Sequence, residues 1–369
     1  MTDTSITPTQ TVDPPAVTLE PQFQSNFVQP GYTVTNNTTI SFNNYTFTPN
    51  PLNFVGKILS SDKNNSFSIS DRDLTNAVFK HDSLFLTTAG AKKIVDTKYI
   101  DLAVLINNSS DNSKYQKSFK IVLNDFLTNR VLAHRGAYVN LNYPENSMAS
   151  LKQAIKLGCQ ASEFDVHITA DKVVIVYHDD TLRNIKGPFW VEKLTYAEIN
   201  DKLKLSNGES VPILKDYIAQ IMTQNKTRLQ LEIKMSMISN PVMHNNECVD
   251  SVISIVHRMG AQAWVHYTSY GYDILKRLVK SDPSAFTIYV DGVTYVYTAA
   301  QIKKDGIAGI DYSYDVFKKT PSLVTDAKAN GLQVGAWTID DSVNMTWWLG
   351  FSPNTILTNQ PELALTIFK

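Results

Sequence analysis

Hydrophobic and polar positions follow two different patterns along this chain of 369 residues. Between about 31 and 126, stretches such as "TTISFNNYTFTP", "SLFLTT" and "YIDLAVLI" alternate apolar and polar residues, and clusters of Asn, Asp, Ser and Lys separate them. Period-two alternation with frequent turn residues is typical of antiparallel β-structure. We therefore expect a small antiparallel β domain over 31–126. Residues 1–30, rich in Thr and Pro, lack the pattern and are expected to form a flexible or extended lead segment.

From 127 to 369 the pattern changes, and apolar segments of β type alternate with amphipathic segments. In the amphipathic stretch "SMASLKQAIKLG", apolar residues share one helical face, Asn146 or Ser147 can cap the start, and Gly158 can end the helix. The alternation of strand and helix is typical of a parallel sheet. Nine β segments are expected, at 130–136, 161–166, 173–178, 228–234, 263–269, 285–290, 307–313, 332–339 and 355–359.

The link between the second and third of these segments contains the short stretch "TADK", residues 169–172. A crossover between parallel strands takes a dozen residues or more, so these two segments must pair as an antiparallel hairpin. Eight strands then remain for a parallel sheet. Their number, and the length of 127–369, match a (β/α)₈ TIM barrel, with an open α/β sheet as the alternative.

Composition narrows the classes of partner. With 34 basic and 35 acidic residues the net charge is −1, which gives no general attraction for nucleic acid or an anionic membrane. The two cysteines, Cys159 and Cys248, lack the spacing of a zinc site and are expected to be inert core thiols. The sequence has no apolar run long enough for a membrane span, and its first residues do not resemble a signal peptide, so export by a cleaved leader is not expected.

Two carboxylates lie on the second β segment, where Glu163 and Asp165 are two residues apart and therefore point to the same side. Like charges in an enclosed space repel each other and lose hydration, so a divalent cation is the simplest way to neutralise them. The alternative is an acidic pair on a solvated strand face. Glu232 and Lys234 repeat the spacing on another strand, and a third carboxylate would complete an oxygen site suited to Mg²⁺ or Ca²⁺. A structural ion pair is the alternative there.

Histidines complete the cluster of candidate functional residues. The hairpin brings His178 roughly opposite Phe164, next to the carboxylates, although a histidine at a strand end is often a surface residue. His134 and Arg135 end the first β segment. In a barrel these residues all fall at the C-terminal ends of the strands, where such enzymes carry out their chemistry. Two imidazoles, a cation and basic groups for an anion fit phosphodiester cleavage.

The region from about 131 to 361 resembles the glycerophosphodiester phosphodiesterases. The stretches that carry the resemblance are "HRGAYVNLNYPENSMASLKQAIKLG", "SEFDVHITADKVVIVYHDDTLRNIKG", "LTYAEINDKLKLSNGESVPILKDYI", "LQLEIK", "GAWTID" and "TILTNQP", which follow the family's order and spacing. "HRG" alone would be a weak signal.

This resemblance implies a role for each matching position. It implies that His134 and His178 are the catalytic acid and base, in an order the sequence leaves open, and that an attacking glycerol hydroxyl would give a cyclic phosphate whereas water would not. It further implies metal ligands, phosphate-binding charges, an aromatic lining the pocket near the glycerol end, and an inserted segment over the barrel mouth. The implied metal ligands are Glu163, Asp165 and Glu232, and the implied phosphate-binding charges are Arg135 and Lys234. The implied pocket aromatic is Trp337, and the inserted segment covers about 179–215.

Two stretches depart from the family pattern. Asn359 in "LTNQP" replaces an acidic residue, which weakens any role inferred for that position. The stretch "RNIKGPF" lacks the threonines common in the family at this place, which leaves the preference for the leaving group open.

No family resemblance covers residues 1–126, and a packing domain is the simplest interpretation of 31–126. An Asn- and Thr-rich β module on such a barrel also looks like the attachment part of a phage tail or baseplate protein, with poly(glycerol phosphate) teichoic acid of Gram-positive walls as substrate. The location would then be the virion tail, the cytoplasm being the alternative, and partners could be further copies or baseplate proteins. Three other functions remain: a housekeeping enzyme for deacylated phospholipids, a catalytically silent wall-binding module, and a metal-independent barrel resembling phospholipase C.

Overall fold

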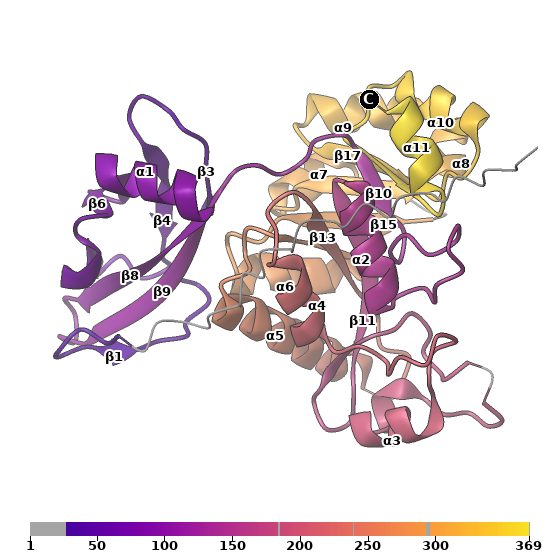
Figure 1. Cartoon of the computed structure of the whole chain (residues 1–369), viewed down its shortest axis with the longest axis horizontal. Helices are drawn as coiled ribbons and strands as arrows, with labels where there is room; N and C mark the ends of the chain where they lie inside the picture. Colours follow the sequence, from indigo (N-terminus) through magenta and orange to yellow (C-terminus); the bar gives the residue numbers. More distant parts are fainter. Residues whose placement is uncertain (1–26, 184, 239, 293–295, 369) are drawn as a thin grey trace, which may run out of the picture.

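The computed structural model describes residues 27–183, 185–238, 240–292 and 296–368. Of the expected lead segment, residues 1–26 lie outside the described residues. The described chain forms a smaller N-terminal part, which continues to Leu123, and a larger part that begins at Val131. Figure 1 shows the two parts side by side, joined by a short connection.

The N-terminal part contains two sheets. Strands β5, β8 and β9 pair antiparallel, and β2, β4, β7 and β6 form a second antiparallel sheet, so the expected antiparallel β-structure is confirmed. Two short strands, β1 and β3, add to β9 in parallel. The bounds are β1 (Thr33–Val34), β2 (Ser41–Phe42), β3 (Thr46–Phe47), β4 (Phe54–Leu59), β5 (Asn65–Ile69), β6 (Ala77–Lys80), β7 (Ser83–Leu86), β8 (Tyr99–Asn108) and β9 (Lys114–Leu123), with a 3₁₀ turn at Asp71–Asp73.

A helix in this part, α1 (Thr88–Thr97), was not expected from the sequence pattern. The Thr87 side chain accepts a hydrogen bond from the Gly90 amide at its start, and Lys98 ends it in a left-handed conformation with φ 69°. Only Gly90 and Ile94 of the helix are buried. The helix therefore presents too narrow an apolar stripe to produce a helical period in the sequence.

The larger part is a closed barrel of eight parallel strands, as expected. Strand order in the described chain is β10-β18-β17-β16-β15-β14-β13-β11, and β10 pairs with β11 to close it. The barrel strands are β10 (Val131–Ala133), β11 (Ala161–Ile168), β13 (Arg228–Ile233), β14 (Val265–Ser269), β15 (Thr287–Asp291), β16 (Gly309–Ser313), β17 (Gln333–Trp337) and β18 (Thr355–Thr358). The helices are α2 (Met148–Leu157), α3 (Tyr196–Lys202), α4 (Leu214–Ile221), α5 (Pro241–Met259), α6 (Tyr272–Ser281), α7 (Ala299–Lys304), α8 (Tyr314–Lys319), α9 (Ser322–Ala329), α10 (Ser342–Leu349) and α11 (Pro361–Ile367), with a 3₁₀ turn at Val191–Lys193.

The expected hairpin is present. Strand β12 (Val174–Val176) pairs antiparallel with β11, and Val166 lies opposite Val176. The amide of Tyr177 then donates to the carbonyl of Asp165 at 3.0 Å. The hairpin therefore carries the chain after β12 back to the carboxylates of β11.

The first barrel helix, α2, begins and ends where its sequence predicts. The Ser147 side chain accepts from the amide of Ser150 and the Ser150 side chain accepts from that of Ser147, which forms a capping box. Gly158 ends the helix with φ 73°, a left-handed conformation that glycine adopts without strain.

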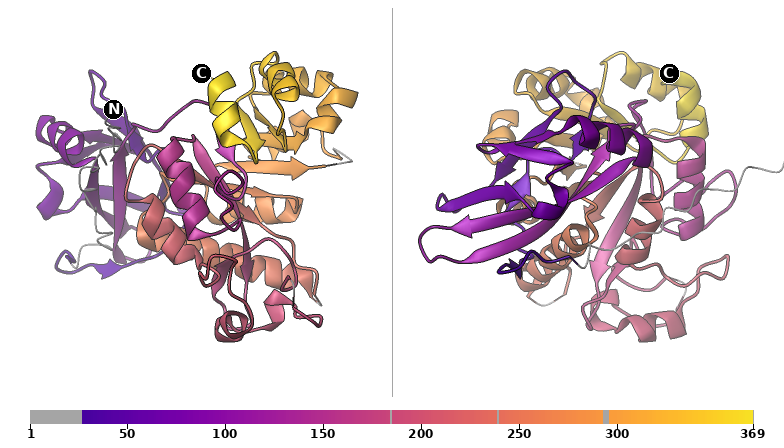
Figure 2. Two further views of the ribbon diagram at one scale, coloured as in Figure 1. Left: turned by 45° about the vertical axis from the view of Figure 1, so that its right-hand side comes forward. Right: turned by 60° about the vertical axis from the view of Figure 1, so that its left-hand side comes forward.

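The N-terminal part packs against the loops that precede the barrel strands. Asn225, in the loop before β13, donates to the carbonyl of Leu123 at 3.0 Å. Lys117 of β9 reaches His257, near the end of α5, with 3.3 Å between Nζ and Nδ1. His257 in turn pairs with Asp282, in the loop before β15, at 2.8 Å. The contact therefore lies at the N-terminal ends of the barrel strands, and Figure 2 shows the two parts from two further sides.

Among the described residues, none of the helices combines the length and the apolar character that crossing a membrane requires. Both cysteines are free and buried, as expected of core thiols.

Candidate active site

A cavity of about 140 Å³ lies within the barrel at the C-terminal ends of the strands. All eight of the functional residues expected from the sequence line it. The complete lining is His134, Arg135, Glu163, Asp165, His178, Gln230, Glu232, Lys234, Thr268, Tyr270, Val290, Asp311, Trp337, Thr338 and Leu357. The eight expected residues, which span the sequence from His134 to Trp337, thus come together in one space.

The turn after β10 places the first histidine and arginine. Arg135 and Gly136 both have positive φ, 53° and 83°, so the chain reverses immediately after His134. A Cβ at position 136 would lie 2.6 Å from Cβ of Ser150, so only glycine fits against α2 here. The amide of Arg135 donates to Oε2 of Glu163 at 2.9 Å, which ties the turn to the neighbouring strand.

The three carboxylates meet inside the cavity. Glu163, Asp165 and Glu232 each offer an oxygen, and these atoms lie within 4.8 Å of one another. Burial and the neighbouring carboxylates Asp165 and Glu232 raise the pKa of Glu163 well above its usual value. Burial also raises the pKa of Glu232. Although burial opposes it, Lys234, His178 and Arg135 hold the pKa of Asp165 below its usual value.

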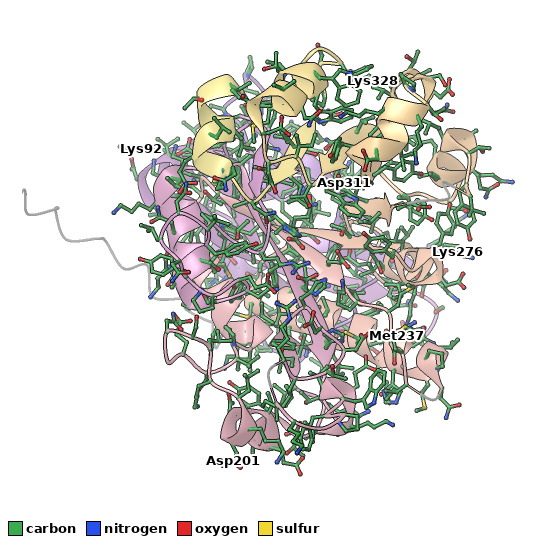
Figure 3. All side chains as sticks on the ribbon, turned by 90° about the vertical axis from the view of Figure 1, so that its right-hand side faces the viewer. Lys92, Asp201, Met237, Lys276, Asp311 and Lys328 are labelled. Atoms are coloured by element: carbon green, nitrogen blue, oxygen red, sulfur yellow. The ribbon has the colours of Figure 1, made fainter. Side chains whose placement is uncertain are left out.

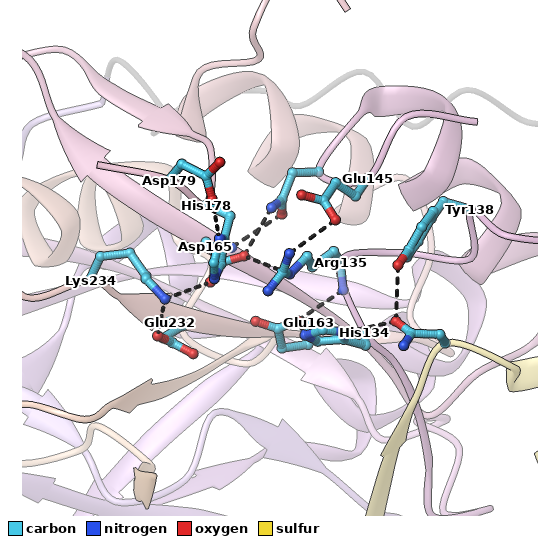
Figure 4. A network of polar contacts seen from close by, with 12 residues as sticks. His134, Arg135, Tyr138, Glu145, Glu163, Asp165, His178, Asp179, Glu232 and Lys234 are labelled. Atoms are coloured by element: carbon cyan, nitrogen blue, oxygen red, sulfur yellow. Dashed lines mark hydrogen bonds and ion pairs between the residues drawn. The ribbon is translucent and has the colours of Figure 1, made fainter. Parts of the chain in front are cut away.

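Two cations stand beside these carboxylates (Figure 4). Lys234 Nζ lies 2.9 Å from Glu232 Oε1 and 3.5 Å from Asp165 Oδ1. Arg135 Nε lies 3.5 Å from Asp165 Oδ2, and its Nη1 donates to Glu145 at 3.0 Å. The carboxylates therefore fix both cations at the edge of the cavity, where they can bind an anion.

His134 is oriented by Asn359, the position at which the sequence departs from the family pattern. Nδ1 of His134 lies 2.7 Å from Oδ1 of Asn359. The amide Nδ2 of Asn359 donates to Asp340 at 2.8 Å, and Tyr138 donates its hydroxyl to the same Oδ1 at 3.1 Å. These contacts orient the amide so that Oδ1 accepts, which puts the proton of His134 on Nδ1 and leaves Nε2 for the cavity.

His178 has a different partner. Its Nδ1 donates to the carboxylate of Asp179 at 2.6 Å, and Arg183 binds the same carboxylate. His167 donates from Nε2 to the carbonyl of His178 at 3.2 Å. Burial lowers the pKa of both His134 and His178, while Asp165 raises both. One imidazole is thus backed by a neutral amide and the other by a carboxylate.

Trp337 forms part of the cavity wall. Its indole Nε1 donates to the carbonyl of Asp311 at 3.0 Å, and its ring meets Tyr270 edge to face, with 5.8 Å between the ring centroids. Sequence reasoning did not identify Asp311, Tyr270, Asn359 or Asp179 as site residues. Asp179 follows His178 directly in "YHDD", which was the one local signal available.

The predicted insertion, 179–215, does not itself line the cavity among the described residues. It has a small core of its own with Leu182, Val191 and Ile199. It reaches the site through Arg183, which donates to Glu145 at 2.6 Å, the same side chain that holds Arg135. Its predicted place over the barrel mouth stays a prediction.

The acidic cluster fits a hard divalent cation. Its three buried carboxylates carry more negative charge than Lys234 and Arg135 together balance, and burial together with the facing carboxylates raises the pKa of Glu163 and Glu232. Carboxylate oxygens are the ligands that Mg²⁺ and Ca²⁺ prefer. The site can therefore hold one cation on the carboxylates, an anion between the cation, Arg135 and Lys234, and two imidazoles positioned to move protons.

Comparison with known proteins agrees with this arrangement. A curated glycerophosphodiester phosphodiesterase from Caldanaerobacter subterraneus subsp. tengcongensis is 25% identical over 248 residues, which cover 65% of this chain and 97% of that protein. A solved glycerophosphodiester phosphodiesterase from Parabacteroides distasonis is 31% identical with a TM-score of 0.59, covering 65% of this chain and 96% of its own. An Oleispira antarctica phosphodiesterase, solved with its product sn-glycerol-3-phosphate, shares the fold at 23% identity and a TM-score of 0.57, over 64% of this chain and 95% of its own.

The pattern of the Glycerophosphoryl diester phosphodiesterase family matches residues 134–363, which is more than half of the sequence and includes every residue that we expected in the site. The resemblance inferred from the motifs is thereby confirmed, and the chain belongs to the glycerophosphoryl diester phosphodiesterase family.

Proposed function

We propose that the protein is a phosphodiesterase that uses one divalent cation, Mg²⁺ or Ca²⁺, to hydrolyse glycerophosphodiesters to glycerol phosphate and an alcohol. The observation that carries the proposal is the convergence of His134 and His178 on the acidic cluster, with Arg135 and Lys234 beside it, in one cavity. Membership of the family and the names of the relatives point to the same reaction.

Each residue has a distinct task in this reaction. Glu163, Asp165 and Glu232 would hold the cation, which when bound would offset charge on a phosphoryl oxygen. Arg135 and Lys234 orient the phosphodiester through its non-bridging oxygens, because both carry fixed charge at the cavity edge.

The two histidines divide the proton transfers. His134, whose Nδ1 is bound to the neutral amide of Asn359, has its Nε2 on the cavity side, 4.0 Å from Oε2 of Glu163, and accepts the proton of the attacking hydroxyl or water there. Burial lowers the pKa of His178, and its Nδ1 hydrogen bond to Asp179 partly opposes that lowering; His178 donates a proton to the departing alkoxide.

We further propose that the natural substrate is poly(glycerol phosphate) teichoic acid of Gram-positive cell walls, and that the protein acts outside the cell as part of a phage tail. The support is the Asn- and Thr-rich β domain attached to the barrel, which suits a role in attachment. The small cavity favours a second candidate, hydrolysis of short diesters derived from phospholipids.

The test is incubation with glycerophosphocholine and with purified lipoteichoic acid, with Mg²⁺ or Ca²⁺ and with EDTA, while released glycerol phosphate is measured. We expect product that requires the cation and that disappears in the His134→Asn variant. Product from glycerophosphocholine alone would favour the short diesters. No product from either substrate with either cation would contradict the enzymatic proposal.

A further inference from the structure

The backbone of His178 depends on a buried histidine that lies outside the cavity. His178 lies two residues beyond the end of β12, so strand pairing no longer holds it. Its carbonyl accepts a hydrogen bond from Nε2 of His167 at 3.2 Å, and the described part of the chain offers this carbonyl no other donor. His167 belongs to β11, where it pairs with Ile175, and is 1% exposed. A barrel strand thus fixes the backbone that carries His178.

The opposite side of the His167 ring faces the predicted insertion, 179–215. Its Nδ1 lies 3.6 Å from Oε1 of Glu192, which is 7% exposed and belongs to the 3₁₀ turn Val191–Lys193. The amide of Val191 donates to the carbonyl of Asp180 at 2.9 Å. The same turn therefore restricts the His167 ring and holds the chain that follows His178.

Glu192 also contacts the loop that carries Lys234. Its Oε2 accepts a hydrogen bond from Oγ of Ser236 at 2.6 Å, and Ser236 follows Lys234 by two residues. In Figure 3, Asp201 marks the insertion at the bottom of the view, and Met237, next to Ser236, marks this loop above it. One buried side chain of the insertion thus reaches both segments, of which one supplies His178 to the cavity and the other Lys234.

We propose that His167 and Glu192 are positioning residues, through which the insertion fixes His178 beside the acidic cluster. The inference rests on the proposed function, because it takes His178 as a proton donor. Neither positioning side chain lines the cavity among the described residues. Without the hydrogen bond from His167, the backbone at His178 gains freedom, and its imidazole is aligned with the leaving oxygen for less of the time. Binding of the diester at Arg135 and Lys234 stays intact.

The first test is steady-state kinetics of glycerophosphocholine hydrolysis over a range of Mg²⁺ concentrations. His167→Leu removes the donor, and we expect kcat to fall about tenfold to a hundredfold while KM changes less than about twofold. His167→Gln keeps a side-chain N–H donor, so we expect it to restore most of kcat. A fall in kcat that more Mg²⁺ reverses would overturn the inference, because the effect would then lie in the acidic cluster.

Ile199→Val is the matched control, because Ile199 is fully buried in the small core of the same insertion. It is expected to lower the melting temperature and to leave kcat unchanged. Equal losses of kcat in Ile199→Val and His167→Leu would overturn the inference, as would a wild-type kcat in His167→Leu. If His167→Leu does not fold, Glu192→Ala carries the same test, with a lower kcat and an unchanged KM as the expected result.

The second test does not require turnover. Hydrogen exchange followed by mass spectrometry is expected to show faster amide exchange in the peptide around His178 in His167→Leu than in the wild type or in Ile199→Val. Unchanged exchange there would overturn the inference even if the wild type hydrolyses no diester. Faster exchange in the variant together with a wild type that hydrolyses no diester would instead contradict the proposed function.

Discussion

Glu163 destabilises the protein as long as no cation is bound, because burial and two nearby carboxylates oppose its ionisation. Its pKa is raised in the folded state, so the folded protein binds a proton more tightly than the unfolded chain. The resulting free-energy penalty is absent below the unfolded pKa and grows as pH rises from about 4.3 toward the raised value. A residue held for function thus lowers stability.

We predict that Glu163→Gln raises the melting temperature of the cation-free protein at pH 8, because the amide removes one of three facing charges. The same variant loses the increase in melting temperature that Mg²⁺ or Ca²⁺ gives the wild-type protein. Differential scanning fluorimetry with and without EDTA measures both effects. If, in EDTA, Glu163→Gln melted at a lower temperature than the wild type, this result would argue against electrostatic strain at Glu163.

Asn359 allows a second prediction. Asn359→Asp places a carboxylate against Nδ1 of His134, which favours the imidazolium and raises the pKa of His134. A base with a raised pKa is protonated at higher pH, so the acidic limb of kcat/KM shifts upward by about one pH unit. The pH profile of glycerophosphocholine hydrolysis measures the shift.

The matched control for this variant is Asn354→Asp, which makes the same change in the loop before β18 and is expected to leave the profile in place. An Asn359→Asp profile that superimposes on the wild type would show that Asn359 does not set the proton affinity of His134.

Residue alternation made most of the candidate site predictable. Glu163 with Asp165 and Glu232 with Lys234 each share one side of a strand because their spacing is two. Asn359 and Asp311 could not be placed in this way. Asn359 meets His134 only because β18 pairs with β10, and Asp311 is isolated in an apolar strand whose inward face depends on barrel closure.

Among the elements, the turn between β10 and α2 depends on one glycine. Gly136→Ala would put a methyl group 2.6 Å from Cβ of Ser150 at φ 83°, which L-residues rarely adopt. We predict a loss of about 1–3 kcal/mol in unfolding free energy and a fall in kcat, because His134 and Arg135 move with the turn. Urea denaturation and steady-state kinetics measure the two effects.

Gly208→Ala is the appropriate comparison for this variant, since Gly208 also has a positive φ, 86°, but a Cβ there meets nothing within 4 Å. It is expected to lose stability without losing kcat. Equal losses of kcat in both variants would contradict the special role of the first turn.

Elements with a strong hydrophobic period were predictable from the sequence, and short ones were not. The β11–β12 hairpin followed from a four-residue connection, and α2 followed from its caps and apolar face. Strands β1 and β3 have two residues each and run parallel to β9, so no alternation marks them. Their pairing is determined by tertiary contacts, which override weak local preferences.

At the scale of the whole molecule, Lys117 joins the two parts through a buried polar chain. Its Nζ donates to the carbonyls of Asn37 and Ile40 and lies 3.3 Å from Nδ1 of His257. Burial lowers the pKa of Lys117 to about 7, below that of an exposed lysine. Between pH 7 and about 10.4 the unfolded chain therefore binds more protons at this position than the folded one.

The stability contributed by Lys117 consequently rises with pH over this interval. We predict that the difference in unfolding free energy between the wild type and Lys117→Met increases in favour of the wild type by up to about 1.4 kcal/mol per pH unit between pH 7 and 9. Chemical denaturation at several pH values measures it. A difference that is constant with pH would show that Lys117 remains charged in the folded protein.

The barrel could be inferred from the count of its strands, but the placement of the N-terminal part could not. Lys117 and His257 are 140 residues apart in the sequence, and neither lies in a pattern that marks an interface. Buried polar contacts between distant segments become visible only when both parts are folded.

The N-terminal part is attached to one end of the barrel, so the two ends of the barrel differ in what they expose. The cavity opens at the strand ends opposite those that Lys117 and Leu123 contact. If a particle or surface held the protein by residues 27–126, the opening of the cavity would therefore face away from it, toward the surrounding medium. Substrate would then approach from the surrounding medium, while the anchored side would stay clear of the incoming substrate and the departing product.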